Sequence, residues 1–548
     1  MNDARITPPP ATDFDTVIVG AGFAGLYMLH RLREAGFTAR VYEAGDGVGG
    51  TWYWNRYPGA RCDIESVDYS YSFSPELEQE WQWTERYPRQ PEILAYLNHV
   101  ADRFDLRRDI QLQTRVTAAH FDEHAGLWRV ETDRGQHVTA RYCVMATGCL
   151  SLPKQPDFPG VERFAGDCYL TAAWPEQDVD LSGKRVGVIG TGSTAIQVIP
   201  QVARQARHLT VFQRTANFSV PARNGPLPAA EQQRIKADYR ARRDISRDSL
   251  FGVPVPMPAA PRRTRDIPPA ELRQTLETLW AQGGAMSLLA AAPDVIADPE
   301  ANAIVAEFVR EKIRATVKDP KVAELLCPST HPLGTKRLCL DTEYYETYNR
   351  DNVSLVDLRA TPIERITEHG LRTSDAEYPL DVLIFATGFD AMTGALNSID
   401  IRGRHGLPLK QAWADGPQTY LGLASAGFPN MFLITGPQSP SVFSNMVVSI
   451  EQHVEWIADC MAYLRQQGIA CIEASAPAQA AWVAHVADVA NGTLMPQADS
   501  WYVGANVPGK PRVFTPYLGG VGPYRQRCRQ VAAKGYEGFE LSRQSVAA

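Results

Sequence analysis

The sequence predicts an α/β fold in which two Rossmann-like dinucleotide-binding domains are joined by a helical insert. Two apolar strands are each followed at once by a glycine-rich turn and a helix, at Gly20–Gly25 and at Gly190–Ala195. The glycine spacing in these turns is the one that lets a backbone approach a pyrophosphate. Two more apolar strands end in Ala-Thr-Gly, at Ala146–Gly148 and Ala386–Gly388. Such strand ends suggest chain crossings between two domains, and the alternative is two buried parallel strands with small turn residues.

Composition restricts the class of protein before any motif is considered. The chain has 548 residues, of which 44% are hydrophobic and 21% charged, as in soluble globular proteins with several domains. Its net charge of -7 argues against a nucleic-acid-binding surface. The N-terminal stretch lacks a signal-peptide core, and no run of about eighteen apolar residues occurs. We therefore expect no membrane span and a cytoplasmic location.

Nine cysteines are scattered along the chain without a C-x-x-C pair. This pattern removes a zinc knuckle and a dithiol redox centre, and it predicts reduced cysteines and no bound metal. The motifs H-E-x-x-H and G-x-S-x-G are also absent from the sequence. Electrons that enter through a nicotinamide cofactor must then leave to oxygen, a quinone-like acceptor or a bound substrate.

The first strand–turn–helix start has every residue type that dinucleotide binding needs. Its strand, helix and second strand are expected at Asp15–Val19, Leu26–Ala35 and Thr38–Tyr42. Gly20 permits the tight turn, Gly22 admits the pyrophosphate, and Gly25 lets the helix pack closely on the strand. The helix N-terminus then faces the phosphates. Glu43 ends the second strand, where an acid binds a ribose hydroxyl.

The second start carries the same signals with one informative difference. Its two strands are expected at Arg185–Ile189 and Leu209–Phe212, and Ala195 replaces the third glycine, as the motif permits. The second strand ends in Gln213-Arg214-Thr215, without an acid. A basic residue at this place favours the 2′-phosphate of NADP over the 2′-hydroxyl of NAD. The alternative is a solvated Arg214 at a strand end.

Residues 226–330 differ in character from both nucleotide-binding domains. They are Pro-rich at 252–262 and then Ala-, Glu- and Arg-rich, with no phosphate-binding glycine loop. We interpret them as a helical insert whose apolar faces are core rather than a partner groove. Two later loop-rich stretches, 435–446 and 499–520, are expected to be lids or pocket walls, with surface linkers as the alternative.

The most unusual stretch is Gly49–Asp63, which reads GGTWYWNRYPGARCD. Its aromatic, glycine and proline residues fit neither the helical nor the strand period, so we expect a functional loop. Its expected partners lie far along the chain, at Lys336 and Arg337 in the sequence GTKRLCLD.

With these residues in view, the chain resembles the flavin-dependent Baeyer–Villiger monooxygenases, especially the phenylacetone, steroid and cyclohexanone monooxygenases. The resemblance covers residues 15–539. It is carried by the two glycine turns and by Gly49–Asp63, Lys336-Arg337, Ala386–Asp390 and Ser500–Tyr502. It implies an FAD domain at residues 1–150 and 386–548, an NADP domain at 151–225 and 331–385, and the insert at 226–330.

The resemblance also implies the reaction. NADPH reduces FAD, oxygen adds to the flavin as a 4a-peroxide, and this peroxide attacks a ketone. Migration of a carbon substituent in the Criegee intermediate then gives an ester or lactone, and sulfoxidation is a further expected activity. The implied partners are a small ketone and O2, and the implied state is a monomer.

Two residues are expected to carry this chemistry. The Arg337 guanidinium is charged at any working pH and can stabilise the peroxide anion and the later oxyanion. Asp63 can hold it through a charge-assisted pair, and a structural salt bridge is the alternative. Lys336 is expected on the NADP phosphate with Arg214, and Trp501 beside the nicotinamide. The expected cofactor contacts are Gly20, Gly22, Phe23, Ala24, Gly25, Glu43, Gly50, Thr51, Trp52, Asp63, Tyr69, Gly190, Thr191, Gly192, Ser193, Thr194, Arg214, Thr215, Lys336, Ala386, Thr387, Gly388 and Trp501.

The expected substrate pocket is apolar. The residues Pro440, Ser441, Val442, Phe443 and Met446 are similar to the pocket-lining bulge of the phenylacetone and steroid enzymes, and Leu150 is expected to join them. Such a wall suits aryl, cyclic or steroid-like ketones. Core packing is the alternative interpretation of Val442 and Met446.

One departure from the family pattern bears on function. Between the two glycine turns the family reads F-x-G-x-x-x-H followed by Trp-Pro, and here Leu170 stands at the histidine position before Trp174-Pro175. Leucine cannot make the hydrogen bonds of an imidazole, so its coupling role must be absent or supplied elsewhere. This leaves two alternatives open, an uncoupled NADPH oxidase and a heteroatom-hydroxylating flavin monooxygenase.

Overall fold

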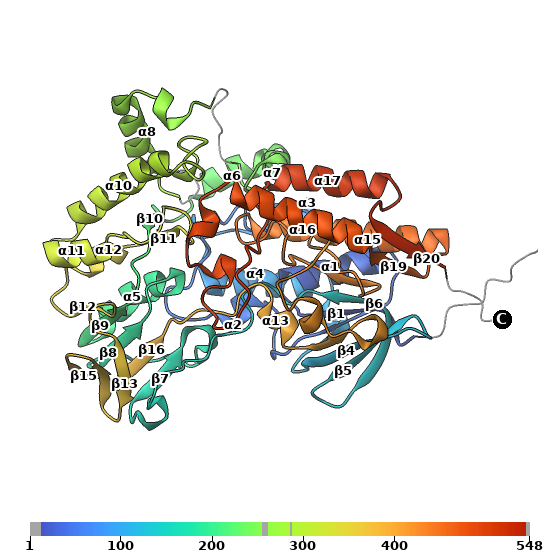
Figure 1. Ribbon diagram of the computed structural model, residues 1–548, viewed down its shortest axis with the longest axis horizontal. Helices are drawn as coiled ribbons and strands as arrows, with labels where there is room; N and C mark the ends of the chain where they lie inside the picture. Colours follow the sequence, from blue (N-terminus) through green and yellow to red (C-terminus); the bar gives the residue numbers. More distant parts are fainter. Residues whose placement is uncertain (1–11, 255–260, 285–287, 544–548) are drawn as a thin grey trace, which may run out of the picture.

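The computed structural model describes residues 12–254, 261–284 and 288–543; the middle of the Pro-rich stretch, 255–260, lies outside these ranges. The fold is the expected α/β arrangement of two sheet-based domains. Figure 1 shows the sheet that contains β8 and β9 at one end of the molecule and the sheet that contains β1 and β6 toward the other. Helices α8 and α10 lie on the side of the β8–β9 sheet.

The first sheet has the strand order β17-β4-β5-β6-β1-β2-β3, with β18 also paired to β6. Strand β1 runs parallel to both β2 and β6, which is the arrangement that the first glycine turn predicts. The strands are β1 (Phe14–Val19), β2 (Ala39–Tyr42), β3 (Ile110–Gln111), β4 (Val116–Asp122), β5 (Leu127–Thr132), β6 (His137–Met145), β17 (Asp400–Arg402) and β18 (Met431–Leu433).

The second sheet is entirely parallel among its described strands, with the order β12-β9-β8-β16-β7. Its strands are β7 (Asp167–Leu170), β8 (Arg185–Ile189), β9 (His208–Gln213), β12 (Val353–Asp357) and β16 (Val382–Phe385). Smaller sheets comprise β10 (Ser219–Pro221) with β11 (Cys339–Asp341), β13 (Ile363–Thr367) with β14 (Gly370–Thr373) and β15 (Glu377–Pro379), and β19 (Cys471–Ala474) with β20 (Phe539–Ser542).

Helices cover both sheets and build the insert. The helices before the second sheet are α1 (Phe23–Glu34), α2 (Thr51–Trp54), α3 (Pro75–Glu80) and α4 (Gln90–Arg103). The second glycine turn opens α5 (Ser193–Gln205), and the insert and its exit contain α6 (Ala229–Ala237), α7 (Tyr239–Asp248), α8 (Pro269–Gln282), α10 (Pro299–Thr316), α11 (Pro320–Leu326) and α12 (Tyr344–Thr347). The C-terminal part contains α13 (Gly394–Asn397), α14 (Leu409–Ala412), α15 (Met446–Gln467), α16 (Ala476–Asn491) and α17 (Val521–Ala533).

The two Ala-Thr-Gly segments occupy equivalent places in the two sheets. Each follows a strand that neighbours the strand of a glycine turn, because β6 pairs with β1 and β16 pairs with β8. A Cβ atom on Gly20 would lie 2.7 Å from the Ala146 carbonyl oxygen, and one on Gly190 would lie 2.6 Å from that of Ala386. The small residues therefore let each strand end pass directly under a glycine turn.

The two connections between the sheets run side by side. The Lys154 amide donates to the Gly388 carbonyl at 3.0 Å, and the Thr387 hydroxyl donates to the Lys154 carbonyl at 3.1 Å. Pro153 and Phe389 form an antiparallel bridge. The chain thus leaves and re-enters the first sheet through a single paired crossing.

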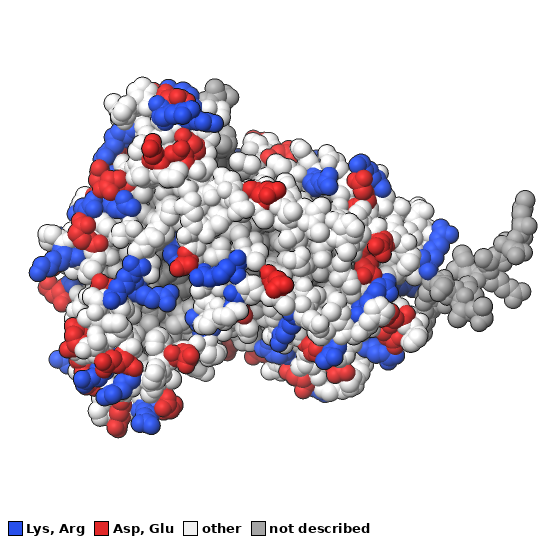
Figure 2. All heavy atoms as spheres, in the orientation of Figure 1, with Lys and Arg blue, Asp and Glu red and all other residues white. Residues whose placement is uncertain are grey.

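Figure 2 shows Lys and Arg side chains interspersed with Asp and Glu over the visible face, without a continuous basic stripe. Within residues 12–254, 261–284 and 288–543, no helix is both long enough and apolar enough to cross a membrane. The same residues contain no cluster of His, Cys, Asp and Glu suited to a metal ion.

Candidate active site

The first glycine turn leaves an open helix N-terminus. A Cβ atom on Gly25 would lie 1.8 Å from the Gly20 carbonyl oxygen, so α1 cannot pack on β1 with a larger residue there. Gly22 is the N-cap of α1 and offers no side-chain hydrogen bond. The side chains of Phe23 and Ala24 are buried in the core, so these two residues present only their backbone N–H groups to an anion.

Glu43 lies where the sequence places it, at the end of β2 and next to this turn. One carboxylate oxygen accepts from the Ala21 amide at 2.8 Å and the other from the Gly45 amide at 2.9 Å. The side chain is buried. The carboxylate is therefore fixed beside the glycine turn, and each oxygen keeps a lone pair for a hydroxyl donor.

The segment Gly49–Asp63 is a loop with one exception. The short helix α2 forms at Thr51–Trp54, which corrects the expectation of an entirely irregular stretch. The cause is that Gly49 and Gly50 adopt positive φ angles and turn the chain so that two carbonyls cap the following amides at 3.0–3.1 Å. A Cβ atom on Gly50 would lie 2.8 Å from the Cα of Gly22, so this loop closes over the first glycine turn.

Two predicted aromatic residues lie together behind that loop. Trp52 Nε1 donates to the Tyr69 hydroxyl at 3.1 Å, and both side chains are buried. The Tyr69 ring also meets Phe23 edge to face, with centroids 5.2 Å apart. Thr51, in contrast, is exposed. The aromatic pair is a rigid wall at the end of the first glycine turn.

The second glycine turn is more open than the first. Gly192 is the N-cap of α5 without a side-chain hydrogen bond, and nothing lies within 4 Å of a Cβ atom built on it. Ser193 is exposed, and the Thr191 hydroxyl donates to the Thr215 carbonyl at 2.7 Å. The free N–H groups of α5 therefore face open space, as an anion site at a helix N-terminus requires.

Two cations meet beside this turn. Burial lowers the pKa of Lys336, and the nearby positive charge of Arg214 lowers it further. Lys336 Nζ donates to the Asp499 carbonyl, and Arg359 donates to the Arg214 carbonyl at 2.9 Å. Arg214 itself is exposed at the end of β9. Lys336 and Arg214 thus bring two positive charges to this side of the second turn.

The structure brings Asp63 and Arg337 together across 274 residues of sequence. Arg337 Nη2 and Nε donate to one Asp63 carboxylate oxygen at 2.6 and 3.1 Å, and Nη1 donates to the Val442 carbonyl at 2.5 Å. Burial opposes the charge on Arg337, but Asp63 outweighs it, and the pKa of Arg337 is raised. Each terminal nitrogen keeps one N–H for another acceptor.

An apolar wall adjoins this ion pair. Leu150, Val442, Phe443 and Met446 belong to one packed cluster, so predicted pocket residues from two parts of the chain do meet. Trp501, which is expected beside the nicotinamide, packs in the same cluster. Residues 435–442 are buried, which excludes the surface-linker alternative for this stretch. Pro440 and Ser441 are buried within the loop, and the Ser441 hydroxyl has no partner among the described residues.

Sequence reasoning missed Tyr502. Its ring packs on Phe443 with centroids 4.3 Å apart and on Trp501 at 4.2 Å. The side chain is fully buried, and burial raises the pKa of its hydroxyl, although the neighbouring Arg337 lowers it. Tyr502 therefore stays protonated between the apolar wall and the guanidinium. Its place in the Ser500–Tyr502 motif, which carries part of the family resemblance, is the signal that could have indicated it.

Comparisons with known proteins agree with this geometry. A family model described as pyridine nucleotide-disulphide oxidoreductase matches residues 17–242. A Baeyer–Villiger monooxygenase of Pseudooceanicola batsensis is 45% identical over 533 residues, which cover 97% of this chain and 96% of the relative. The chain belongs to the Baeyer–Villiger monooxygenase family.

Other relatives of this monooxygenase extend the comparison. A phenazine N-monooxygenase, PhzNO1, of Lysobacter antibioticus is 44% identical over 97% of each chain. Among solved structures, an oxidized steroid monooxygenase bound to NADP has a TM-score of 0.93 and 54% identity, covering 97% of this chain and 100% of that one. The structure of OTEMO with FAD and NADP has a TM-score of 0.94 and 41% identity, with the same coverage.

The monooxygenase uses FAD and NADP(H), and its own residues fit both groups. The N-cap glycines of α1 and α5 leave backbone N–H groups free at each turn. Lys336 and Arg214 bring positive charge to the side of the second turn. The buried Glu43 lies at the first turn, where an acid suits a ribose.

Leu170 ends β7 at the edge of the second sheet of the monooxygenase. Its side chain packs in an apolar cluster with Phe385 and Ile189, and its backbone pairs with Phe385. The next residue, Thr171, is buried and donates its hydroxyl to the Phe385 carbonyl at 3.2 Å. The residue after Leu170 thus supplies a side-chain hydrogen bond that joins the end of β7 to β16, the strand that precedes Ala386.

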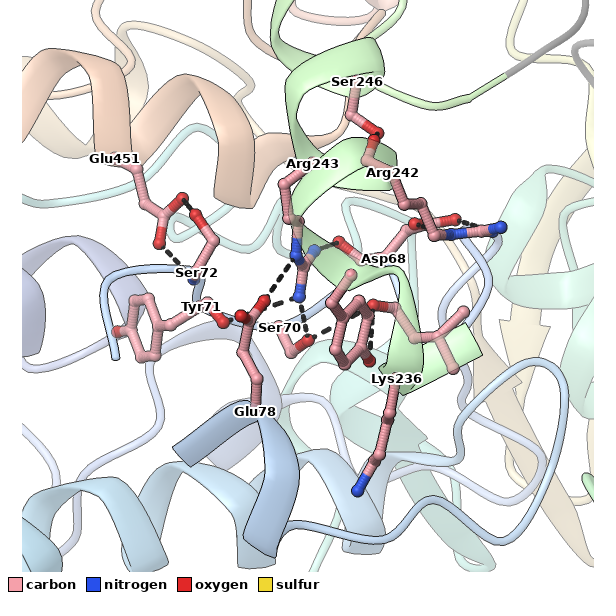
Figure 3. A network of polar contacts seen from close by, with 12 residues as sticks. Asp68, Ser70, Tyr71, Ser72, Glu78, Lys236, Arg242, Arg243, Ser246 and Glu451 are labelled. Atoms are coloured by element: carbon pink, nitrogen blue, oxygen red, sulfur yellow. Dashed lines mark hydrogen bonds and ion pairs between the residues drawn. The ribbon is translucent and has the colours of Figure 1, made fainter. Parts of the chain in front are cut away.

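Helix α7 of the insert meets the first domain of the monooxygenase through ion pairs as well as through Tyr239, which is buried in the core of that domain. On α7, Ile245 is 57% exposed whereas the Arg243 side chain is only 4% exposed. The reason is visible in Figure 3, where Arg243 contacts Glu78 and Ser70 and Arg242 contacts Asp68. The apolar faces of α8 and α10 do form core, as expected, because Leu272, Leu276, Val305 and Phe308 are buried in one cluster with the strands of the second sheet.

Proposed function

We propose that this monooxygenase inserts one oxygen atom beside the carbonyl of aryl, cyclic or steroid-like ketones, giving esters or lactones. The observation that carries the proposal is the Asp63–Arg337 pair, which is bonded to the Val442 carbonyl of the apolar wall. A charged donor beside an apolar surface suits a substrate that is apolar apart from one oxygen. The domain division follows the sheets, with FAD at the first turn and NADP at the second.

The cofactors supply the redox chemistry of the reaction, and the residues of the protein orient the reactants and exclude water. When bound, NADPH supplies the hydride, and reduced FAD with O2 supplies the oxygen atom that attacks the ketone. Arg337 offers its two remaining N–H groups to the negative charge that develops on oxygen. Asp63 and the Val442 carbonyl hold the guanidinium in one orientation, and the packed ring of Trp501 keeps water away.

The deciding experiment is turnover of the FAD-loaded enzyme with NADPH, isotopically labelled O2 and a cyclic or aryl ketone. We expect one labelled oxygen in the ester or lactone and consumption of NADPH in proportion to product. Hydrogen peroxide in proportion to NADPH, without ester for any ketone of these classes, would overturn the proposal and favour an uncoupled oxidase.

Oxidation of nitrogen or sulfur is a second candidate function, and the similarity to a phenazine N-monooxygenase favours it. Heteroatom oxidation needs no stabilised oxyanion on the substrate, so it would depend less on Arg337. Competition between an aryl ketone and an aryl methyl sulfide separates the two candidates. Preferential sulfoxide formation with little ester would support the second one.

Replacing Arg214 by alanine tests the NADP assignment. We expect the KM for NADPH to rise about 10–100-fold, because a charge-assisted phosphate contact contributes about 1.5–3 kcal/mol. The KM for NADH should stay unchanged, because NADH has no 2′-phosphate. Steady-state kinetics with both cofactors measure the ratio, and Arg163→Ala, at an 81% exposed side chain, is the matched control. Equal losses for NADPH and NADH would contradict a phosphate contact.

Leu170 stands where the family has a histidine, so another residue must support the crossing between the two domains. Replacing Thr171 by valine tests whether the Thr171 hydroxyl has this role. We expect the native enzyme to stay coupled and Thr171→Val to release several-fold more hydrogen peroxide per NADPH. The Phe385 carbonyl would lose its side-chain partner, which costs about 1–3 kcal/mol where such a group is buried. The peroxide-to-NADPH ratio at saturating ketone is the measurement. Thr171→Ser, which keeps the hydroxyl, should behave as the native enzyme.

A further inference from the structure

A cavity of about 540 Å³ lies in the C-terminal part of the fold, between α16, α17 and the loop that precedes α17. Its lining includes Tyr420, Trp482, His485, Tyr517 and Arg527. None of these residues belongs to the Asp63–Arg337 pair, to the glycine turns or to the apolar wall beside them. The cavity is therefore a separate feature of the molecule.

Aromatic rings form the floor of this cavity. Trp482 and Tyr517 are buried, their centroids lie 5.1 Å apart and their planes are inclined by 35°. Tyr420 is also buried, and its hydroxyl donates to the Glu537 carbonyl at 3.0 Å. His485 extends the surface, because its ring lies 5.3 Å from that of Trp482. Such rings offer flat faces to a ring-shaped apolar ligand.

One cation at this cavity has no acidic partner. Arg527 is exposed on α17 and forms no ion pair with a carboxylate of the described residues. Its positive charge lowers the pKa of the nearby Tyr420 hydroxyl, against the larger effect of burial. The acid on the cavity rim, Glu537, is already paired with Lys534 at 2.9 Å. A carboxylate that entered beside the aromatic floor would thus meet an available guanidinium.

The floor of the cavity is bonded directly to the loop that enters the ketone pocket. Trp482 Nε1 donates to the Gln438 carbonyl at 3.1 Å, and the Tyr517 amide donates to the Ser439 carbonyl at 3.1 Å. Gln438 and Ser439 immediately precede the bulge Pro440–Phe443. A ligand that packs on Trp482 and Tyr517 therefore acts on the supports of the pocket wall.

We propose that this cavity is a second small-molecule site, which takes a carboxylate carrying an aromatic or alicyclic ring and changes the affinity of the ketone pocket when occupied. The ring lies on Trp482 and Tyr517, and the carboxylate pairs with Arg527. Binding of the carboxylate in this cavity does not depend on the proposed function, whereas its effect on ketone affinity rests on the proposed ketone oxygenation. Because coupling is reciprocal, a bound ketone changes the affinity for the carboxylate by the same factor.

The test uses sodium phenylacetate as the probe and calorimetric titration of the FAD-loaded enzyme without NADPH, so that no turnover is needed. We expect a Kd of about 0.1–1 mM for a probe of this size. Arg527→Gln should weaken binding about tenfold or more, and Ala481→Phe, at the cavity rim, should block it. Arg529→Gln, on an exposed residue of the same helix outside the cavity lining, is the matched control and should bind as the native enzyme.

The two variants also distinguish binding in this cavity from binding of phenylacetate in the ketone pocket. Its Kd would then be unchanged in both Arg527→Gln and Ala481→Phe, and that result, or no binding of the probe, would overturn the site. A neutral isostere, phenylacetamide, should bind more weakly at the proposed site because it lacks the charge. The coupling is measured as a change of at least about threefold in the ketone KM, within the usual range of coupling free energies, and absent in Arg527→Gln. Binding that leaves this KM unchanged would overturn the coupling and leave ketone oxygenation untouched.

Discussion

Replacing Arg337 by alanine is expected to reduce ketone oxygenation by about 10²–10³-fold or more, the loss typical of one oxyanion-stabilising donor. Reduction of bound FAD by NADPH should remain close to the native rate, because hydride transfer builds no oxyanion that the guanidinium would stabilise. The loss should appear in both kcat and kcat/KM, as for an interaction made only in the transition state. Anaerobic stopped-flow reduction and aerobic ester formation, measured on the same preparation, separate the two steps.

Lysine at position 337 is the informative companion variant. It keeps a positive charge near Asp63, but an ammonium cannot bond Asp63 and the Val442 carbonyl through a planar fork. We therefore expect Arg337→Lys to lose most of the oxygenation as well. Asp63→Asn should give a smaller loss, because it leaves the guanidinium in place but weakens its hold. Ester formation at the native rate in Arg337→Ala would remove Arg337 from the reaction.

Local sequence patterns were sufficient to predict where the glycine turns and the residue after β9 lie. The glycines at 20, 25 and 190 are required by backbone approaches within a few residues or between neighbouring strands, so their spacing carries the prediction. The position of Arg214 could be predicted in the same way, because it directly follows β9 and the end of a strand fixes where the next residue lies. The proximity of Asp63 and Arg337 was different, because only the family resemblance linked residues 274 positions apart.

Other parts of the site depend on tertiary packing that no local pattern encodes. The ring of Tyr502 packs on Phe443 only because residues 435–446 and 499–520 fold onto each other. The Val442 carbonyl is an acceptor for Arg337, yet a backbone group has no sequence signature. The short helix α2 follows from the positive φ angles of Gly49 and Gly50, which composition indicates only as a turn.

The helix α7 shows the limit most clearly. Its sequence YRARRDISRD reads as a charged, solvated helix, whereas Arg243 is buried and Ile245 is exposed. The guanidinium of Arg243 is satisfied by Glu78 at 2.8 Å, by the Asp68 carbonyl at 3.1 Å and by Ser70 at 2.7 Å. Hydrogen-bond partners from a distant segment, and not hydropathy, decide which face of this helix is inside.

These contacts link the insert to the proposed ketone pocket. The Asp68 carbonyl that accepts from Arg243 also accepts from Asn445 Nδ2 at 2.7 Å, and Asn445 caps α15 directly after the pocket bulge. Nearby, the buried Glu451 accepts from the amide of Ser72 at 2.5 Å, and burial raises its pKa. Figure 3 shows this network joining α7 to the segment Asp68–Ser72.

Replacing Arg243 by methionine should therefore lower the free energy of unfolding of this part of the molecule by about 3–5 kcal/mol, because Glu78 would remain buried without its partner. A denaturant titration measures the change, with the fluorescence of the FAD that unfolding releases as the signal. Arg240→Met, at a 92% exposed side chain on the same helix, should leave stability unchanged. Removing both charges in Arg243→Met with Glu78→Leu should recover most of the loss, since two apolar groups can replace a buried ion pair at little cost. A double variant as unstable as Arg243→Met alone would mean that the carbonyl contacts to Asp68 and Tyr71, rather than the Glu78 charge, make Arg243 necessary.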